Sequence, residues 1–176
     1  MTNPARTAQV RLEPWTAADL DLLRRFNAPE MRAHLGGSEP DEQVQARQER
    51  YLEAVRSGAY QPLRIVLPGA GEVAGGIVFW ERTWADHGIY EIGWSVLPEF
   101  QGRGIAAAAT AAAVRLAAAE GRQRYLHAFP AVDNAASNGV CRKVGFTLRG
   151  GCEVEYPPGH PMRCNDWRLD LAALDR

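Results

Sequence analysis

The residues best suited to chemistry lie between Tyr90 and Ala106, where an expected strand runs through a short loop into a helix. Gly102 and Gly104 remove side chains from this loop, so backbone N–H groups can approach a bound anion closely. The helix that follows directs the positive end of its dipole at the same loop. The segment therefore predicts an anion site, and a pyrophosphate would fit it.

Two common phosphate-binding loops do not match this segment. No Gly-Lys-Ser/Thr follows, which excludes a Walker A loop, and the glycine spacing differs from that of a dinucleotide-binding Gly-x-Gly-x-x-Gly turn. The glycines could also serve only a tight turn between strand and helix, which is a common use of glycine. A second motif further along the chain favours the anion site.

The two motifs together resemble a known family. Residues 96–106 read VLPEFQGRGIA, which is similar to the V-x-P-x-x-[QR]-x-x-G-x-[GA] signature of the GNAT N-acetyltransferases. Residues 134–146 read NAASNGVCRKVGF and resemble the N-x-x-[AS]-x-x-x-x-x-K-x-G-F helix of that family. The run EIGW at residues 91–94 and Ser137 are typical of its subgroup similar to the ribosomal-protein-alanine acetyltransferases. The resemblance is clear over residues 90–146.

The resemblance implies acetyl-CoA as the acyl donor, with its pyrophosphate in the glycine-containing loop. A splayed pair of strands would bind the pantetheine arm through unpaired backbone groups, and Asn134 and Ser137 would lie near the thiol end. From the residues alone, Asn134 is equally a helix N-cap, and Arg103 can simply point into water. The cofactor-binding residues expected on this basis are Val96, Leu97, Gln101, Gly102, Arg103, Gly104, Ile105, Ala106, Asn134 and Ser137.

Acetyl transfer to an amine needs a neutral nitrogen, a polarised thioester carbonyl and a proton for the departing thiolate. Glu91 is the candidate base, acting through a water, although a strand glutamate can also just pair with a cation across the sheet. The resemblance gives the backbone N–H of the strand containing Val96 the role of polarising the carbonyl. Many members carry a tyrosine acid where this chain has Cys141, so Ser137 is the candidate proton donor. No base that could activate Cys141 as a nucleophile is evident nearby.

The acceptor is an amine that the sequence does not identify further. A small molecule would need a closed pocket, whereas a protein N-terminus would need an open groove. Aromatic residues that could line either are Trp80, Trp84, Trp94 and Tyr156, although strand aromatics usually pack in the core. His160 lies in a proline-rich turn that could cover the acceptor. Two other functions stay open, namely a CoA-binding module without turnover and a phosphate-loop protein that binds a nucleotide.

Composition limits the class of protein. A chain of 176 residues with 46% hydrophobic and 23% charged residues predicts one globular domain, an N-acetyltransferase domain over residues 1–176. The net charge of −1 gives no bulk attraction for nucleic acid or for anionic lipid. No apolar run is long enough for a leader or a membrane span, so we expect a cytoplasmic protein with neither nucleic acid nor membrane as partner.

The cysteines and histidines show no metal-ligand spacing. Three cysteines without a CxxC pair argue against a disulfide framework and a structural zinc site, and the four histidines match no ligand motif. We therefore expect no metal. The family's habit is compatible with a homodimer, but no sequence feature marks an interface.

The remaining elements must build a sheet that positions the motifs. Alternating and periodic apolar patterns predict strands at residues 9–13, 63–67, 72–80, 88–97, 124–129, 147–154 and 163–171, and helices at residues 16–26, 41–56, 105–120 and 134–144. Pro14 should end the first strand, and a turn around residues 86–88 should follow the third. The order predicts an α/β (α+β) protein with a mixed, mostly antiparallel sheet of about seven strands flanked by about four helices, the GNAT fold.

Overall fold

The computed structural model describes residues 8–174, and the element bounds below refer to that part of the chain. Seven strands form one sheet there, in the order β1-β2-β3-β4-β5-β7-β6. The strands are β1 (Arg11–Pro14), β2 (Gln61–Val66), β3 (Val73–Trp84), β4 (His87–Val96), β5 (Tyr125–Ala128), β6 (Thr147–Glu155) and β7 (Pro161–Asp170). The α-helices are α1 (Leu20–Phe26), α2 (Asp41–Ser57), α3 (Ile105–Glu120) and α4 (Ala135–Val144).

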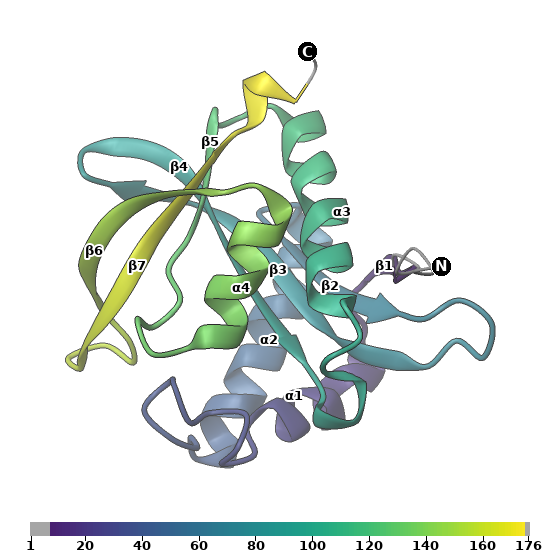
Figure 1. Cartoon of the computed structure of the whole chain (residues 1–176). Coiled ribbons are helices and arrows are strands. Elements are labelled where there is room, and N and C mark those ends of the chain that lie inside the picture. Colours follow the sequence, from purple (N-terminus) through teal and green to yellow (C-terminus); the bar gives the residue numbers. More distant parts are fainter. Residues whose placement is uncertain (1–7, 175–176) are drawn as a thin grey trace, which may run out of the picture.

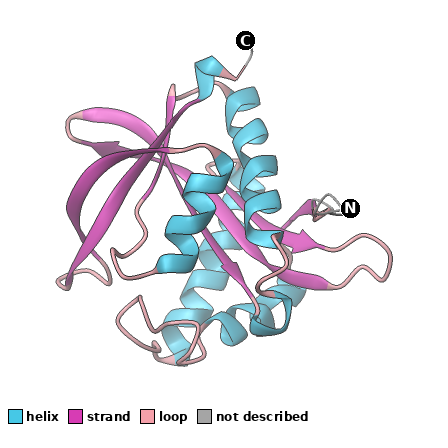
Figure 2. Cartoon of the chain, viewed as in Figure 1, coloured by secondary structure: helices cyan, strands magenta, loops and turns pink. Residues whose placement is uncertain are grey.

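The sheet is antiparallel except at one place, where β4 and β5 run parallel. A parallel neighbour needs a crossover, and α3 supplies it. Helices α3 and α4 cover one face of the sheet, and α1 and α2 lie behind it (Figures 1 and 2). The predicted fold class is confirmed: a mixed, mostly antiparallel seven-stranded sheet flanked by four α-helices in the described part of the chain.

Residues of β4 alternate between these two faces. Tyr90 points to the α3 side, because its hydroxyl donates a hydrogen bond to the Glu120 carboxylate at the end of α3 (3.2 Å). On the other face, a Cβ added to Gly76, which lies opposite Ser95, would meet the Phe26 ring of α1 at 3.0 Å. Glu91 and Ser95 are an even number of residues apart on β4, so their side chains lie on the same face of the sheet. The Glu91 side chain is therefore on the α1–α2 side.

The alanine-rich sequence of α3 lets this helix pack closely on the sheet. Ala109, Ala113 and Ala117 are fully buried at helical spacing within the main hydrophobic core. The helix contacts both β3 and β4. Small side chains thus bring the helix against the strand that leads into its own N-terminal loop, as the sequence predicted.

Two predicted boundaries at the strands were wrong. Pro14 belongs to β1 and lies opposite Leu63; β1 is an edge strand, where a missing N–H removes no ladder hydrogen bond. Strand β3 extends to Trp84 instead of ending at Trp80, because the turn is formed by Ala85 and Asp86, both with positive φ (47° and 63°). A two-residue turn of this kind matches the twist of a hairpin.

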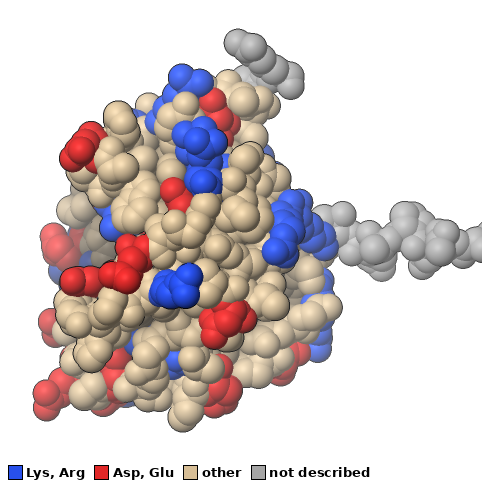
Figure 3. Space-filling model, turned by 60° about the vertical axis from the view of Figure 1, so that its left-hand side comes forward, with Lys and Arg blue, Asp and Glu red and all other residues tan. Residues whose placement is uncertain are grey.

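The molecular surface mixes both signs of charge. On the face shown in Figure 3, Lys and Arg side chains are interspersed with Asp and Glu. Within residues 8–174, no helix is both long and apolar enough to cross a bilayer.

Candidate active site

The site begins where β4 and β5 separate. They pair only at Tyr90 with Leu126 and at Glu91 with His127, whereas β4 continues to Val96. Beyond these two pairs, the edge of β4 that faces β5 is left open.

Val96 turns its backbone toward this opening. The N–H of Leu97 donates to the Ala74 carbonyl of β3 at 2.9 Å. Consecutive residues of a strand direct their backbone groups to opposite edges, so Val96 directs its own away from β3. Its carbonyl accepts a hydrogen bond from Gln101 Nε2 at 2.8 Å, while its N–H faces the opening. The open strand edge that the family resemblance implies is therefore present.

A cavity of about 1160 Å³ occupies the opening and continues across to the α2 side of the sheet. The predicted site residues that line it are Glu91, Val96, Gln101, Gly102, Gly104, Ile105, Ala106, Asn134 and Ser137. Leu97 is instead buried in the core. Arg103 is exposed, and its guanidinium lies over the Phe100 ring, 5.6 Å from the centroid.

The glycine-containing loop has the backbone that an anion site requires. Gly102 and Gly104 both take positive φ (73° and 75°), which side-chain-bearing residues rarely adopt. The first helical hydrogen bond of α3 runs from Ala108 N–H to the Gly104 carbonyl at 3.1 Å. The N–H groups of residues 105–107 precede it and have no helical acceptor, so they point out of the helix end together with its positive dipole.

Lys143 adds a full positive charge at this helix end. A Cβ added to Gly104 would lie 3.6 Å from Lys143 Nζ, and Lys143 lines the cavity. Sequence reasoning did not assign Lys143 to the site, although the residue stands in the helix motif. Only the packing of α4 against α3 brings it to a loop some forty positions earlier.

The start of α4 presents a hydroxyl to the cavity. Asn134 acts as the N-cap, since its Oδ1 accepts the Ser137 N–H at 3.1 Å. Ser137 is half-buried and lines the cavity. Cys141, one turn further on, is fully buried, and burial raises the pKa of its thiol to about 12. A thiol in that state is not a nucleophile at neutral pH. Cys141 also does not line the cavity, so it is not placed to take the role of the usual tyrosine acid.

A buried amide fixes α4 in place. Asn138 Oδ1 accepts hydrogen bonds from Trp167 Nε1 and Asn165 Nδ2, both at 2.8 Å. Its Nδ2 donates to the carbonyls of Ala131 at 2.9 Å and Asn134 at 2.8 Å. Both N–H groups of the side-chain amide therefore have acceptors. The two hydrogen bonds to Oδ1 connect α4 to β7. No sequence motif predicts this contact, which joins residues that lie 27 and 29 positions apart.

Glu91 lies in the cavity wall, with a cation beside it. Its side chain is 14% exposed and forms a hydrogen-bonded ion pair with Arg82 of β3. Burial is the main influence and raises the pKa of Glu91, while Arg82 and the nearby His127 act to lower it. His127 in turn shares a hydrogen bond with the Asp166 carboxylate at 2.7 Å.

Aromatic rings hold Arg82 in this position. Its guanidinium lies 5.4 Å from the ring centroid of Trp84 and 5.5 Å from that of Phe129. Trp84 Nε1 donates a hydrogen bond to the Asp166 carboxylate at 3.2 Å. Trp84 thus contacts both Arg82 and Asp166, and it does not line the cavity. The other aromatic candidates, Trp80, Trp94 and Tyr156, do line it, whereas His160 is exposed outside it.

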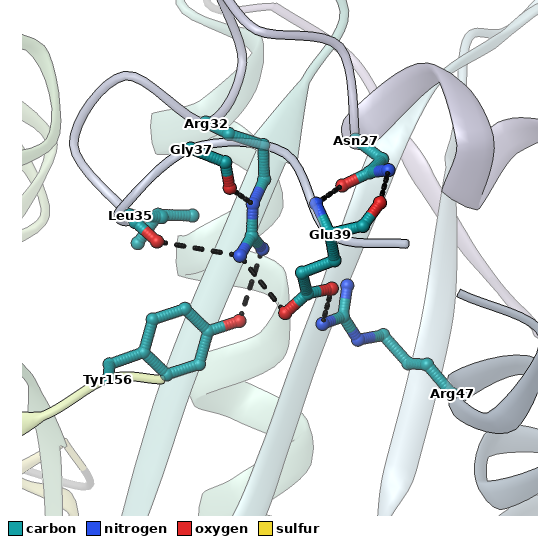
Figure 4. A network of polar contacts seen from close by, with 7 residues as sticks. All are labelled: Asn27, Arg32, Leu35, Gly37, Glu39, Arg47 and Tyr156. Atoms are coloured by element: carbon teal, nitrogen blue, oxygen red, sulfur yellow. Dashed lines mark hydrogen bonds and ion pairs between the residues drawn. The ribbon is translucent and has the colours of Figure 1, made fainter. Parts of the chain in front are cut away.

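The far end of the cavity is closed by a second polar network (Figure 4). Arg32, from the loop between α1 and α2, pairs with Glu39 at 3.0 Å and donates to the Tyr156 hydroxyl at 3.2 Å. Arg47 of α2 pairs with the same Glu39. The loop, α2 and the β6–β7 hairpin are thereby joined around the cavity.

Among residues 8–174, no group of three or more His, Cys, Asp or Glu side chains is placed to hold a metal ion. The polar side chains that line the cavity include the carboxylates of Glu30, Glu81 and Glu91 and the hydroxyls of Ser95, Ser137 and Tyr156.

An open β4 edge, a glycine loop at the N-terminus of a helix and a carboxylate across the sheet are the features that the resemblance to the acetyltransferases implied. The chain belongs to the GNAT acetyltransferases: residues 9–147 match the family model described as acetyltransferase (GNAT) domain. It is therefore an acetyltransferase, as the sequence predicted. No curated protein sequence is detectably similar to it.

Solved structures of the family have the same fold. An acetyltransferase from Bacillus anthracis is similar with a TM-score of 0.76 at 18% identity, covering 94% of this chain and 98% of that one. An acetyltransferase from Salmonella typhimurium, described as modifying the N-terminal serine of ribosomal protein L7/L12, gives 0.75 at 23% identity, with coverages of 95% and 97%. Spermidine N-acetyltransferase from Vibrio cholerae, solved with CoA and spermine, gives 0.74 at 15% identity, with coverages of 93% and 96%.

Proposed function

We propose that this enzyme moves an acetyl group directly from acetyl-CoA to a primary amine, on a small molecule or a protein N-terminus. The observation that carries the proposal is the cavity that joins the open β4 edge at Val96 to Glu91 on the α2 side. One cavity thus offers a place for a thioester and a place for an amine. Solved structures of similar fold include one with CoA and spermine bound.

The donor end of the cavity suits CoA. The free N–H groups of residues 105–107 and Lys143 Nζ would bind the pyrophosphate, since amide dipoles and an ammonium both favour an anion. The Val96 N–H would donate a hydrogen bond to the acyl and pantetheine part of acetyl-CoA. In this proposal Leu97 anchors the end of β4, and Arg103 stands exposed beside the loop, within reach of a phosphate.

The chemistry would take place between β4 and α4. Glu91 accepts the ammonium proton through a water, and the neutral amine nitrogen then forms a bond to the acetyl carbon. The Val96 N–H stabilises the negative oxygen that develops on that carbon. The carbon–sulfur bond breaks, and Ser137 gives its proton to the departing thiolate while its oxygen takes up the proton that the acetylated nitrogen loses. Positioning of both reactants in one cavity contributes to the rate as well.

Three further expectations stay predictions. They are one N-acetyltransferase domain over residues 1–176, a cytoplasmic location and a homodimer. The acceptors of similar structures differ, since one is described as acting on a ribosomal protein and another on spermidine. The fold by itself therefore does not select the amine.

A screen of primary amines with acetyl-CoA tests the proposal. CoA release would be followed continuously, and the acetylated amine identified by mass spectrometry. We expect turnover that falls strongly in Glu91→Gln protein. If CoA binds but no amine turns over, the chain is a CoA-binding module, and if CoA does not bind, the proposed site is wrong.

A further inference from the structure

A second cavity of about 280 Å³ lies next to the main one, between α2 and the turn of the β6–β7 hairpin. It is lined by Glu39, Gln43, Ala46, Arg47, Arg50, Tyr156, Pro157 and Pro158. Arg47, Arg50 and Tyr156 line the main cavity as well. The second cavity is therefore adjacent to the acceptor side, away from the glycine loop.

The charges around this cavity do not balance. Glu39 is its acidic residue, and this one carboxylate is shared by Arg32 and Arg47 (Figure 4). Arg50, one turn after Arg47 on α2, pairs with no carboxylate of residues 8–174. The lining of the second cavity thus holds two guanidiniums and a single carboxylate, which also pairs with Arg32 of the loop, and the cavity is positively charged.

The two arginines of α2 that line this cavity, Arg47 and Arg50, also have N–H donors without acceptors in the described chain. Arg47 donates to Glu39 through Nη2, and within the described chain its Nε and Nη1 have no hydrogen-bond acceptor. A guanidinium carries five N–H donors in a fixed plane that matches two oxygens of a carboxylate or phosphate. Arg47 and Arg50 are therefore suited to hold such a group between them.

We propose that the second cavity is a subsite for an anionic group of the acceptor, so that the substrate is an amine that also carries a carboxylate or phosphate. The proposal rests on the proposed function and names its substrate class. The amine extends toward Glu91, whose charge Arg82 already offsets, and the anionic end lies at Arg50. Pockets for whole drug-sized ligands measure roughly 300–1,000 Å³, so the smaller cavity fits one end of such a molecule.

A calorimetric titration with inorganic phosphate tests the subsite without a known acceptor. The protein is first saturated with CoA, which occupies the glycine loop, and phosphate is then titrated into wild type, Arg50→Gln, Arg50→Lys and Arg56→Gln. Arg56 is an exposed arginine of the same helix that pairs with Glu53, and it serves as the matched control. Arg50 is exposed and has no ion-pair partner among residues 8–174, so Arg50→Gln should fold normally.

We expect phosphate to bind the CoA complex and Arg50→Gln to weaken it about tenfold, since a charge-assisted hydrogen bond is lost. Arg50→Lys should retain most of the affinity, and Arg56→Gln all of it. Absence of phosphate binding, or equal binding by Arg50→Gln, would overturn the subsite. If CoA itself does not bind, the proposed function fails. The phosphate titration is then done on Lys143→Gln protein, in which the positive charge beside the glycine loop is removed, so that binding at the second cavity is measured separately.

Matched acceptor pairs distinguish carboxylate from phosphate. Tyrosine is compared with tyramine, and phosphoethanolamine with ethanolamine, by kcat/KM for CoA release. The anionic member of a pair should be preferred about tenfold by wild type and by Arg56→Gln, and the preference should fall toward one in Arg50→Gln. A preference for tyramine, ethanolamine or spermidine would contradict the proposal while leaving acetyl transfer intact.

Discussion

Arg82 and Glu91 lie diagonally opposite each other on β3 and β4 and form an ion pair in the wall of the main cavity. Diagonal neighbours on one face of an antiparallel pair are within reach of long side chains. The candidate base is thus held by a cation at one oxygen while the cavity leaves room for water or an amine. Burial still dominates and raises the pKa of Glu91 above its usual value near 4.5.

Replacing Glu91 by Gln should lower kcat by about 10²- to 10⁴-fold, which is the range for losing a general base. CoA affinity should stay within about twofold, because Glu91 lies across the sheet from the glycine loop. Steady-state CoA release and calorimetry would measure the two effects. Glu153→Gln, an exposed change on β6, serves as the control. Wild-type kcat in Glu91→Gln protein would show that the ion pair is only structural.

Glu91 also predicts a pH dependence of stability. Because its pKa is raised in the folded protein, the folded state binds the proton more tightly than the unfolded state. Its contribution to the free energy of unfolding is full below about pH 4.5 and is lost as the pH rises through the folded pKa. The free energy of unfolding of wild type minus that of Glu91→Gln, measured in urea, should therefore fall as the pH rises above about 4.5. A difference that rises with pH would contradict the raised pKa.

The position of Lys143 over the N-terminus of α3 makes it a determinant of CoA affinity. Lys143→Gln should weaken CoA binding about tenfold, since one charge-assisted hydrogen bond to a phosphate is lost. Added salt should reduce the wild-type affinity more than that of the variant. Arg115→Gln changes an exposed cation further along α3 and should have no effect. Equal CoA dissociation constants for Lys143→Gln and Arg115→Gln would remove the lysine from the site.

Gly75 is required by the close approach of β3 and β4. A Cβ added there would lie 2.1 Å from the Ser95 carbonyl oxygen, so the strands would have to separate beside Val96. Gly75→Ala should lower the free energy of unfolding by about 2 kcal/mol or more, as expected for overpacking. Gly93→Ala meets nothing within 4 Å and should cost less than about 1 kcal/mol. Equal unfolding midpoints for the two variants in urea would contradict this packing.

Cys141 should take no part in catalysis, because its thiol is buried and its pKa is about 12. Cys141→Ala should keep kcat within about threefold of wild type, provided that the protein is folded. Native protein should also leave this thiol unmodified by iodoacetamide, as peptide mass spectrometry would show. Fast alkylation of Cys141 with loss of activity would reverse the assignment.

The family and the fold could be predicted from sequence because their signals are local. The glycine loop, the strand before it and the helix after it occupy one continuous segment, residues 90–120, and the motif fixes their order. Glu91 and Ser137 were likewise predicted from positions within motifs, and both line the cavity. Their catalytic roles stay predictions.

The missed features depend on contacts between distant segments. Arg82 was placed outside the third strand, because the sequence did not show that Ala85 and Asp86 would form a two-residue turn. Lys143 reaches Gly104 only through helix packing. The charge balance around Arg50 depends on a loop that crosses from α1 to α2. Periodic sequence patterns do not predict such contacts, because the contacts depend on the tertiary structure.

The most direct test of the account is a thermal-shift titration of the purified protein with acetyl-CoA, CoA, ATP and NAD. A ligand present at 100 times its Kd stabilises a folded protein by about 2.7 kcal/mol. We predict stabilisation by acetyl-CoA and CoA, and much weaker effects from ATP and NAD. Stabilisation by ATP or NAD without CoA, or no stabilisation at millimolar CoA, would contradict an acetyl-CoA site at the glycine loop.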